Sequence, residues 1–229
     1  MNRIFRTSDA GAALRKNGAP GFGTLVGLSK NGKYAVLACF YTGKSDEDKN
    51  VKFNDFGNEV MLMPRFAGHP MGEHALVSSP VKKSGQRVFV NDGSLTDLLV
   101  GASCAGNCFV DALCGTEASR RTHVGGILCL EEEFSYKLFC VKPANEEASA
   151  NNTMIFSFSP VAGVGHLVTE FGKGGAPFAG EPSRVTVLSN PEAFADKLWK
   201  NLGDDRVALV VRYISLSSGR SATRIRGLD

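Results

Sequence analysis

One run of side chains, Tyr34–Tyr41, constrains the fold more than any other segment. It reads Tyr-Ala-Val-Leu-Ala-Cys-Phe-Tyr and is apolar at nearly every position, as is Val207–Val211 near the end of the chain. A strand with one solvated face alternates apolar and polar residues, whereas a strand covered on both faces does not. Both segments are therefore expected to be interior strands with other layers of structure on each side.

The remaining segments indicate many strands. Asn31-Gly32 separates Phe22–Ser29 from Lys33–Thr42 and is a strong signal for a two-residue hairpin. Further strands are expected at Glu59–Met63, His74–Ser78, Gln86–Val90, His123–Leu130, Phe134–Lys142, Thr153–Ser159 and Arg184–Leu188. Many hairpins with interior strands favour an α+β fold, in which two stacked sheets are sandwiched between helical layers, over a parallel-sheet fold.

Helices are fewer. Between Thr96 and Leu113, apolar side chains recur at helical spacing and predict one helix with a single buried stripe. The stripe consists of Leu98, Ala102, Ala105, Phe109 and Leu113. A second helix begins at Pro191, because proline is favoured in a first turn. Its apolar face is expected to consist of Phe194, Leu198 and Leu202.

Length and charge limit the classes of function. The 229 residues suffice for a single domain over 1–229. The net charge of only +3 is smaller than that expected of a protein that binds nucleic acid. No apolar stretch of membrane-spanning length and no signal-peptide core occur, so we expect no nucleic-acid or membrane partner and a cytoplasmic location. The basic segment 217–229 is expected to be a flexible tail.

The cysteines do not predict a disulfide or metal framework. Six cysteines are too few for a disulfide scaffold in a chain without an export signal. Cys104 and Cys108 lie among alanines and glycines, which indicates packing rather than metal binding. No metal or cofactor is expected.

The polar segment Asn91–Asp97 carries the most information about function. It follows the strand-like Gln86–Val90 and opens the first expected helix. Asp92-Gly93 would turn the chain, and Ser94 and Asp97 would cap the helix. The N–H groups of such a terminus also form an anion site. A turn and cap with no further role is the alternative.

Two more polar clusters lie at the ends of expected strands. The loop Gly43–Asn50 follows an apolar strand and could hold a phosphate or a base, although a plain solvated loop would look the same. His123 follows Arg120–Thr122 and could serve in acid–base chemistry near neutral pH. None of the standard signatures, such as a Walker loop or a nucleophile elbow, is present.

Several weak motifs occur in a fixed order along most of the chain. They are Pro20–Gly23 with Val26–Leu28, Gly43–Ser45 with Asn50, Asn91–Ser94 with Thr96-Asp97, and Ala162–His166 with Gly180–Pro182. In this order they resemble the archaeal-type IMP cyclohydrolases and their bacterial relatives. The resemblance implies a four-layered αββα sandwich similar to that of the N-terminal-nucleophile hydrolases.

The resemblance also implies an enzyme that closes the purine ring of formyl-AICAR to give IMP and water. The carboxamide nitrogen of the substrate attacks its own formyl carbon, so the reaction needs positioning, oxyanion stabilisation and proton transfer but no cofactor. The candidates for phosphate or ribose contacts are then Lys44, Lys49 and Lys82. Those for contacts to the base or ribose are Asn50, Asp92, Gly93, Ser94 and Asp97. The catalytic candidates are His123, Glu117 and Ser78.

Some positions depart from the family pattern. Ser78 stands at the position of a family tyrosine, and Lys82 and His123 stand at positions of family arginines. Lysine lacks the bidentate fork with which arginine holds a phosphate. One alternative is therefore a weakened homologue that binds a purine nucleotide or a formyltransferase partner without turnover. Another is an amidohydrolase of the same fold, which would need cleavage to free an N-terminal nucleophile. A homo-oligomer is left open.

Overall fold

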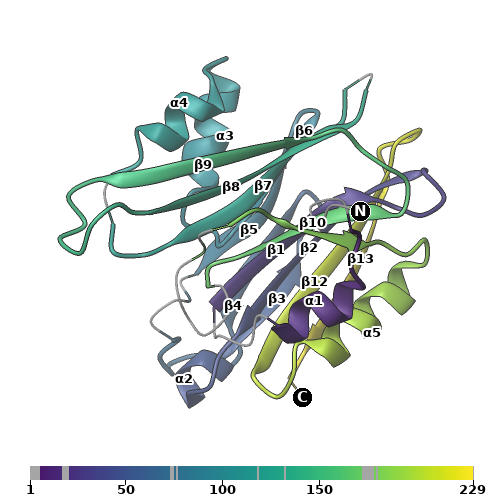
Figure 1. The fold of residues 1–229 in the computed structure, drawn as a ribbon. Coiled ribbons are helices and arrows are strands. Elements are labelled where there is room, and N and C mark those ends of the chain that lie inside the picture. Colours follow the sequence, from purple (N-terminus) through teal and green to yellow (C-terminus); the bar gives the residue numbers. More distant parts are fainter. Residues whose placement is uncertain are drawn as a thin grey trace.

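The structure is a computed structural model that describes residues 6–16, 21–72, 75, 77–117, 119–131, 133–171, 178 and 180–228. It contains two antiparallel sheets that face each other and a small number of helices (Figure 1). The fold is therefore of the α+β class, as predicted. No helix formed by these residues is long and apolar enough to cross a membrane.

The first sheet has six strands in the order β11-β10-β1-β2-β12-β13. These strands are β1 (Gly21–Leu28), β2 (Tyr34–Thr42), β10 (Val164–Thr169), β11 (Ser183–Thr186), β12 (Arg206–Ser215) and β13 (Ser221–Gly227). The two continuous apolar runs lie in β2 and β12, and their side chains are buried from Ala35 to Tyr41 and from Val207 to Val211. The prediction that both are interior strands is confirmed.

Burial on both faces of β2 has a direct cause. Leu37 and Cys39 point toward the second sheet and join the core between the sheets. Val36, Ala38 and Phe40 point the other way and pack with helices. The predicted hairpin is also confirmed, because Gly32 adopts a φ of 69° in the turn between β1 and β2, which pair antiparallel.

The second sheet has seven strands in the order β3-β4-β5-β6-β7-β8-β9. These strands are β3 (Val51–Asp55), β4 (Glu59–Pro64), β5 (Ser78–Ser84), β6 (Arg87–Asn91), β7 (His123–Cys129), β8 (Ser135–Pro143) and β9 (Asn151–Phe158). The strand predicted from His74 begins instead at Ser78, and His74 itself lies outside the described residues. β5 contains a proline and several polar residues, so its pattern alone did not reveal it.

Helices pack on the outer face of each sheet. These helices are α1 (Ala10–Lys16), α3 (Thr96–Cys104), α4 (Phe109–Cys114) and α5 (Pro191–Asn201), whereas α2 (Asp46–Lys49) is a short helix between β2 and β3 that has no buried residue. Phe194 and Leu198 of α5 pack with Val36 and Val211 of the first sheet. Leu99 of α3 and Leu113 of α4 form a separate cluster with apolar residues of the second sheet. The prediction of a helix at Pro191 is confirmed.

The single helix predicted between Thr96 and Leu113 is wrong. The segment forms α3 and α4, because the chain turns at Gly106, whose φ of 72° is incompatible with a continuous right-handed helix. Leu98, assigned to the buried stripe, is 43% exposed. Leu99 is buried in its place.

The prediction of a flexible tail is wrong for most of 217–229. Residues 221–227 form β13, which pairs with β12. Arg224 and Arg226 form ion pairs with Glu192 of α5, and Ile225 packs against the core. The alternation of basic and apolar residues therefore reflects a strand with two different faces.

Candidate functional site

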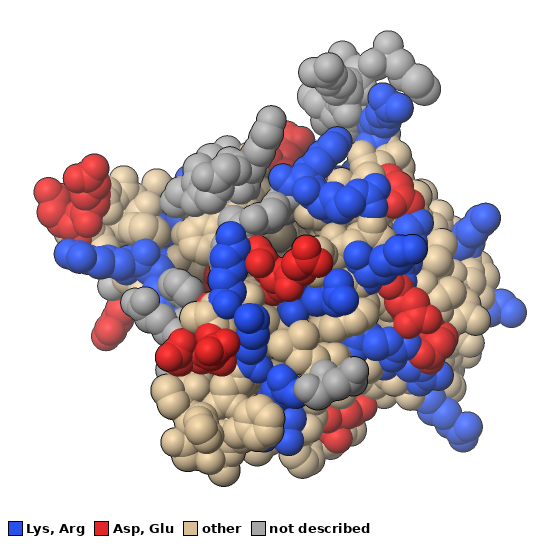
Figure 2. Space-filling view, turned by 90° about the horizontal axis from the view of Figure 1, so that it is seen from below, with Lys and Arg blue, Asp and Glu red and all other residues tan. Residues whose placement is uncertain are grey.

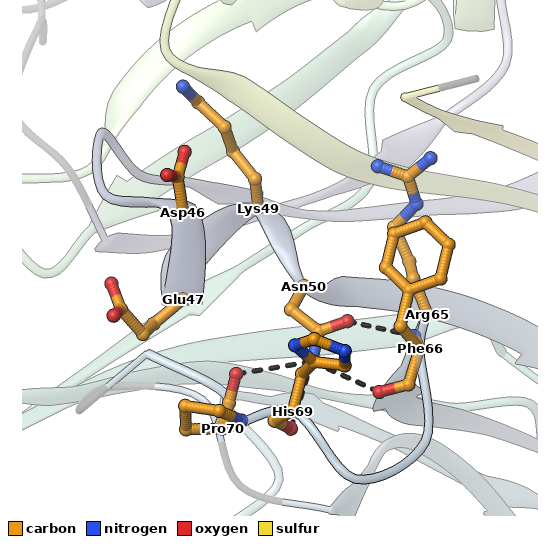
Figure 3. Close-up of a pocket in the computed structure, with 8 residues that line it drawn as sticks. All are labelled: Asp46, Glu47, Lys49, Asn50, Arg65, Phe66, His69 and Pro70. Carbon is orange, nitrogen blue, oxygen red and sulfur yellow. Dashed lines mark hydrogen bonds between the residues drawn. The ribbon is translucent and has the colours of Figure 1, made fainter.

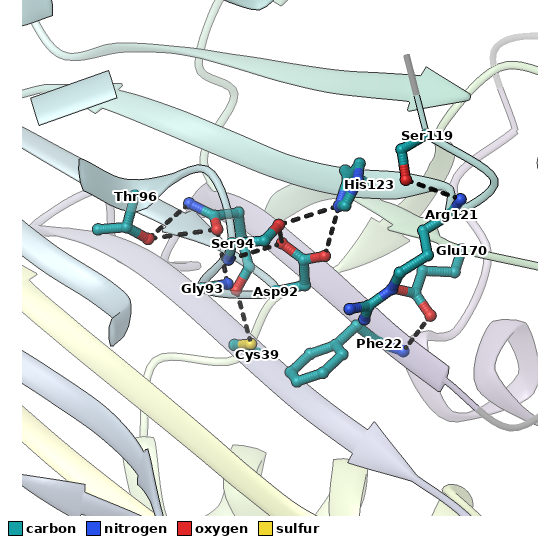
Figure 4. A network of polar contacts seen from close by, with 11 residues as sticks. Phe22, Cys39, Asp92, Gly93, Ser94, Thr96, Ser119, Arg121, His123 and Glu170 are labelled. Carbon is teal, nitrogen blue, oxygen red and sulfur yellow. Dashed lines mark hydrogen bonds and ion pairs between the residues drawn. The ribbon is translucent and has the colours of Figure 1, made fainter. Parts of the chain in front are cut away.

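Ends of strands from both sheets lie next to each other around one network of polar contacts (Figure 4). In the first sheet, β1 begins beside the end of β2 and the end of β10. In the second sheet, β6 ends beside the start of β7. The two groups are in contact, since the Cys39 thiol of β2 lies 3.7 Å from the Asn91 carbonyl oxygen at the end of β6. Asp92, Arg121, His123 and Glu170 are located at these ends.

Asp92, Ser94 and His123 form a compact hydrogen-bonded group. The Asp92 Oδ2 atom lies 2.8 Å from His123 Nδ1, and Asp92 Oδ1 accepts a 2.6 Å hydrogen bond from the Ser94 hydroxyl. Ser94 Oγ is also 2.9 Å from His123 Nδ1. A carboxylate at Nδ1 fixes the tautomer with a proton on that nitrogen. The Nε2 atom of His123 is then left to exchange a proton with a ligand.

The charge state of Asp92 follows from its surroundings. Its side chain is fully buried, and burial by itself raises the pKa of a carboxyl group. The hydrogen bond and charge of His123 outweigh burial, with help from Ser94 and Arg121, and hold the pKa of Asp92 below its usual value. Asp92 is therefore a carboxylate that stabilises positive charge on His123.

The turn that carries Asp92 is held by its own side chains. Asn91 Oδ1 accepts a hydrogen bond from the Gly93 N–H at 2.6 Å, and Asn91 Nδ2 donates to Thr96 Oγ1 at 2.9 Å. Gly93 has a φ of 92°, and a Cβ atom there would lie 2.1 Å from Ser78 Oγ. A glycine is thus required at position 93 for two independent reasons.

The same geometry corrects the expected cap of the first helix. Leu95 occupies the N-cap position of α3, and no side chain caps this terminus. Ser94 does not cap, because its hydroxyl is bound to Asp92 and His123. Asp97 is exposed and bonds with Lys82 rather than with the helix N-terminus.

Glu170 was not predicted, although it is the most unusual acid of the site. It follows the last residue of β10, is 3% exposed, and accepts a 3.0 Å hydrogen bond from the Phe22 N–H through Oε2. The other oxygen, Oε1, is buried and has no hydrogen-bond partner among the described residues. Burial and then the charge of Asp92 raise the pKa of Glu170 to about 8. Glu170 is therefore mostly a neutral proton donor at pH 7.

Two further residues that were not predicted interact electrostatically with Glu170. The positive charge of Arg121 opposes the rise in the pKa of Glu170 and also favours ionised Asp92. The Tyr41 hydroxyl donates to Asp48 Oδ1 at 2.7 Å, and burial followed by this hydrogen bond raises the pKa of Tyr41. A charged residue directly after an apolar strand is the only signal by which the sequence could have indicated Glu170.

The structure brings together part of the predicted site. Asp92, Gly93, Ser94 and His123 lie in one group, and Ser78 is next to Gly93. The other predicted residues lie elsewhere. Lys82 and Asp97 form a 3.1 Å ion pair, and Lys82 also pairs with Glu59. Lys44 has a side chain that is 66% exposed and pairs with Asp205 at 3.7 Å. Glu117 is exposed, and its carbonyl oxygen accepts a hydrogen bond from Asn151.

Lys49 and Asn50 lie in a different hollow of about 310 Å³, whose lining does not include Asp92 or His123 (Figure 3). Asn50 is 5% exposed, and its amide nitrogen donates to the carbonyl oxygens of Phe66, His69 and Pro70. Its amide oxygen accepts from the Phe66 N–H at 2.8 Å. Asn50 therefore holds a loop in place with the groups that were expected to bind a base or ribose.

Charge is mixed on one face of the molecule. Viewed from below, lysine and arginine side chains surround a central group of acidic side chains (Figure 2). Among the residues that the structure describes, no group of three or more histidine, cysteine, aspartate and glutamate side chains is placed to hold a metal ion.

A comparison with models of known protein families and with curated proteins finds no match for this chain.

Proposed function

We propose that this protein is an IMP cyclohydrolase-like enzyme that closes the purine ring of formyl-AICAR to give IMP and water. The observation that carries the proposal is that Asp92 is bound to Ser94 and His123 and also interacts electrostatically with the buried Glu170. The group combines a proton acceptor and a proton donor. An intramolecular condensation requires both and needs no covalent nucleophile.

The architecture supports the same proposal. The core between the sheets contains residues from both of them, α5 packs on the outer face of one, and α3 and α4 pack on the outer face of the other. This arrangement is consistent with a four-layered αββα sandwich similar to that of the N-terminal-nucleophile hydrolases. We include that fold in the proposal.

The first half of the reaction forms the new ring bond. Nε2 of His123 takes a proton from the carboxamide nitrogen as that nitrogen bonds to the formyl carbon. Neutral Glu170 gives its proton to the formyl oxygen, which becomes a hydroxyl group. Asp92 stabilises the imidazolium that forms, as a buried carboxylate does for a catalytic histidine.

The second half releases water and restores both residues. The His123 imidazolium protonates the hydroxyl group, and the carbon–oxygen bond breaks. The Glu170 carboxylate takes the proton from the formyl-bearing nitrogen as the carbon–nitrogen double bond forms. The substrate thus loses one oxygen and two hydrogens, and both side chains return to their initial protonation states.

A second candidate function is nucleotide binding without turnover. It is favoured by the positions of Lys82 and Glu117, which lie outside the group around Asp92. Lys44 and Lys49 remain proposed phosphate contacts, but Lys44 is already paired with Asp205. A homologue with weakened phosphate contacts would keep the fold and lose activity.

Turnover of formyl-AICAR by the purified protein, followed by the absorbance of the purine ring, tests the proposal. His123→Ala is expected to lower the rate by about 10²–10⁴-fold and to leave IMP affinity within about tenfold, as for one acid–base group. Asp92→Asn should lower the rate as well, because an amide stabilises the imidazolium less and can favour the wrong tautomer. Asp111→Asn, an exposed position on α4, is the matched control.

Each result of this experiment has a separate meaning. Binding of IMP without ring closure above the uncatalysed rate would favour the binding-only homologue. Unchanged turnover in His123→Ala would remove His123 from the mechanism. Protein that is folded but neither binds nor converts these nucleotides would overturn both candidate functions.

A further inference from the structure

A second group of unusual side chains lies at the opposite edge of the sheets from β3 and β13, where β9, β10 and β11 are neighbours in space. In the first sheet, His166 of β10 is directly opposite Val26 of β1 and Arg184 of β11. Residues opposite each other on antiparallel strands point to the same face. Since Val26 belongs to the core between the sheets, His166 and Arg184 also point toward the second sheet.

The second sheet presents aromatic rings to this edge. Phe158 of β9 is opposite Tyr136 of β8, and Tyr136 belongs to the core between the sheets, so Phe158 points toward the first sheet. The rings of Phe158 and His166 are stacked, with centroids 3.6 Å apart and planes 12° from parallel. A 2.7 Å hydrogen bond joins the Tyr136 hydroxyl to His166 Nδ1. The stack is therefore fixed from two sides.

The sheets leave a cavity of about 610 Å³ next to this stack. Its lining includes Phe156, Phe158, His166, Arg6, Arg184 and Glu181. The volume falls within the range of small-molecule sites, about 300–1,000 Å³. Apolar rings with a few polar groups are also the usual composition of such sites.

The charges of the cavity favour an anion. Arg184 Nε donates to Thr7 Oγ1 at 3.0 Å, and within the described part of the chain neither Arg184 nor Arg6 forms an ion pair. The two arginines exceed the one carboxylate of Glu181. Burial, followed by the charge of Arg184, lowers the pKa of His166 to about 4, so the imidazole is an uncharged ring at pH 7.

We propose that this cavity is a binding site for a planar aromatic ligand that carries an anionic group, either a phosphate or a carboxylate. The aromatic ring packs against the wall formed by Phe156, Phe158 and His166, and the anion pairs with Arg184. Arginine suits this role because its guanidinium group forms two parallel hydrogen bonds with either anion. The site does not depend on the proposed ring closure, since it shares no residue with the group around Asp92.

Amide chemical shifts of labelled protein, followed during titration, test the site. Adenosine 5′-monophosphate and 2-naphthoate are the two probes. Adenosine and inorganic phosphate are the partial counterparts of the first, and 2-naphthol and acetate are those of the second. We expect saturable shifts at Ser157, Val164 and Ser183 with at least one probe. The counterparts of that probe should bind at least about tenfold more weakly than the probe itself, as for the loss of a charged hydrogen bond. Comparison of 2-naphthyl phosphate with 2-naphthoate, which share the ring, identifies the anion as phosphate or carboxylate.

Arg184→Ala should lower the affinity for the probe that binds by about tenfold to a hundredfold. Thr7→Val is the matched control, because it removes the hydrogen bond that holds Arg184 without removing the charge. An equal loss in both variants would show that Arg184 acts only structurally and would overturn the proposal.

Three further outcomes decide the remaining points. Equal affinity for adenosine and its monophosphate, or saturation by inorganic phosphate alone, would overturn the combined recognition of ring and anion. An absence of shifts at this edge with both probes would overturn the site itself. Asp92→Asn should leave these shifts unchanged, so failure of the proposed ring closure and failure of this site are distinguishable.

Discussion

Glu170 makes the stability of this protein depend on pH in a direction that is unusual for an acid. Most carboxyl groups in folded proteins have lowered pKa values and stabilise the fold as pH rises. Burial and the neighbouring charge of Asp92 instead raise the pKa of Glu170 from 4.5 to about 8. Between these two values the folded protein binds a proton that the unfolded chain releases. The free energy of unfolding must therefore fall as pH rises through this window.

The magnitude follows from proton linkage. A difference of one bound proton changes the free energy of unfolding by about 1.4 kcal/mol per pH unit. Between about pH 5 and pH 8, the contribution of Glu170 should thus decrease by roughly 3 kcal/mol. Glu170 is 3% exposed, so solvent screening of this contribution is small. The stabilisation is fully present below pH 4.5 and is lost by about pH 8.

Glu170→Gln isolates this contribution. The amide keeps an oxygen that accepts from the Phe22 N–H and cannot ionise. We expect urea unfolding to give similar stabilities for the two proteins near pH 5, and the variant to be more stable by roughly 3 kcal/mol near pH 8. The substitution also removes the charge repulsion between Glu170 and Asp92, which is one of the two causes of the raised pKa and therefore belongs to the contribution that is measured.

The same substitution at the exposed Glu147 is the control, since it changes one glutamate without changing a buried group. A difference between wild type and Glu170→Gln that stays constant from pH 5 to pH 8 would refute the reasoning. So would a wild-type protein that gains stability relative to the variant as pH rises. Either result would mean that Glu170 is ionised throughout this window and is not the proton donor.

The remaining predictions concern charged pairs. The Arg212 side chain is 3% exposed and forms a 2.7 Å ion pair with Asp55. Asp55→Ala should therefore lower the free energy of unfolding in urea, by an amount near the lower end of roughly 3–5 kcal/mol. Adding Arg212→Met to this variant should recover part of that loss. No recovery would show that Arg212 acts through packing. Lys44→Ala should change the free energy of unfolding by less than about 0.5 kcal/mol, because the Lys44 side chain is 66% exposed. As a proposed phosphate contact, Lys44 should contribute roughly 1.5–3 kcal/mol to nucleotide binding, which calorimetry on the variant measures. Unchanged affinity would remove Lys44 from the site.

The elements that the sequence predicted well are those whose pattern is determined locally. β2 is apolar along its whole length because it contacts a sheet on one side and helices on the other. The turn at Asn31-Gly32 depends only on the conformational freedom of its own residues. In contrast, β13 is a strand because β12 pairs with it and α5 supplies carboxylates for its arginines. Its sequence alone is equally compatible with a polar tail.

The site was predictable in part for the same reason. His123 was predicted as a proton-transfer residue and Asp92 as a contact to the base or ribose, because each polar side chain stands next to an apolar strand. Glu170 stands at such a position too, but its importance depends on β10 lying beside β1, which brings it to the Phe22 N–H. This neighbour relation joins segments far apart in the chain, so no local pattern contains it.

Ser94 shows how tertiary structure can replace a local rule at a functional position. Its place before a helix predicts an N-cap, which stabilises a helix by about 1 kcal/mol. The structure leaves the terminus of α3 without a side-chain cap and directs the Ser94 hydroxyl to Asp92 and His123. A position where sequence and structure disagree in this way is where a functional constraint is expected. Stability lost at the helix terminus is offset by the hydrogen bonds that keep Asp92 ionised and the His123 ring oriented, and these are the two conditions that acid–base chemistry at this site requires.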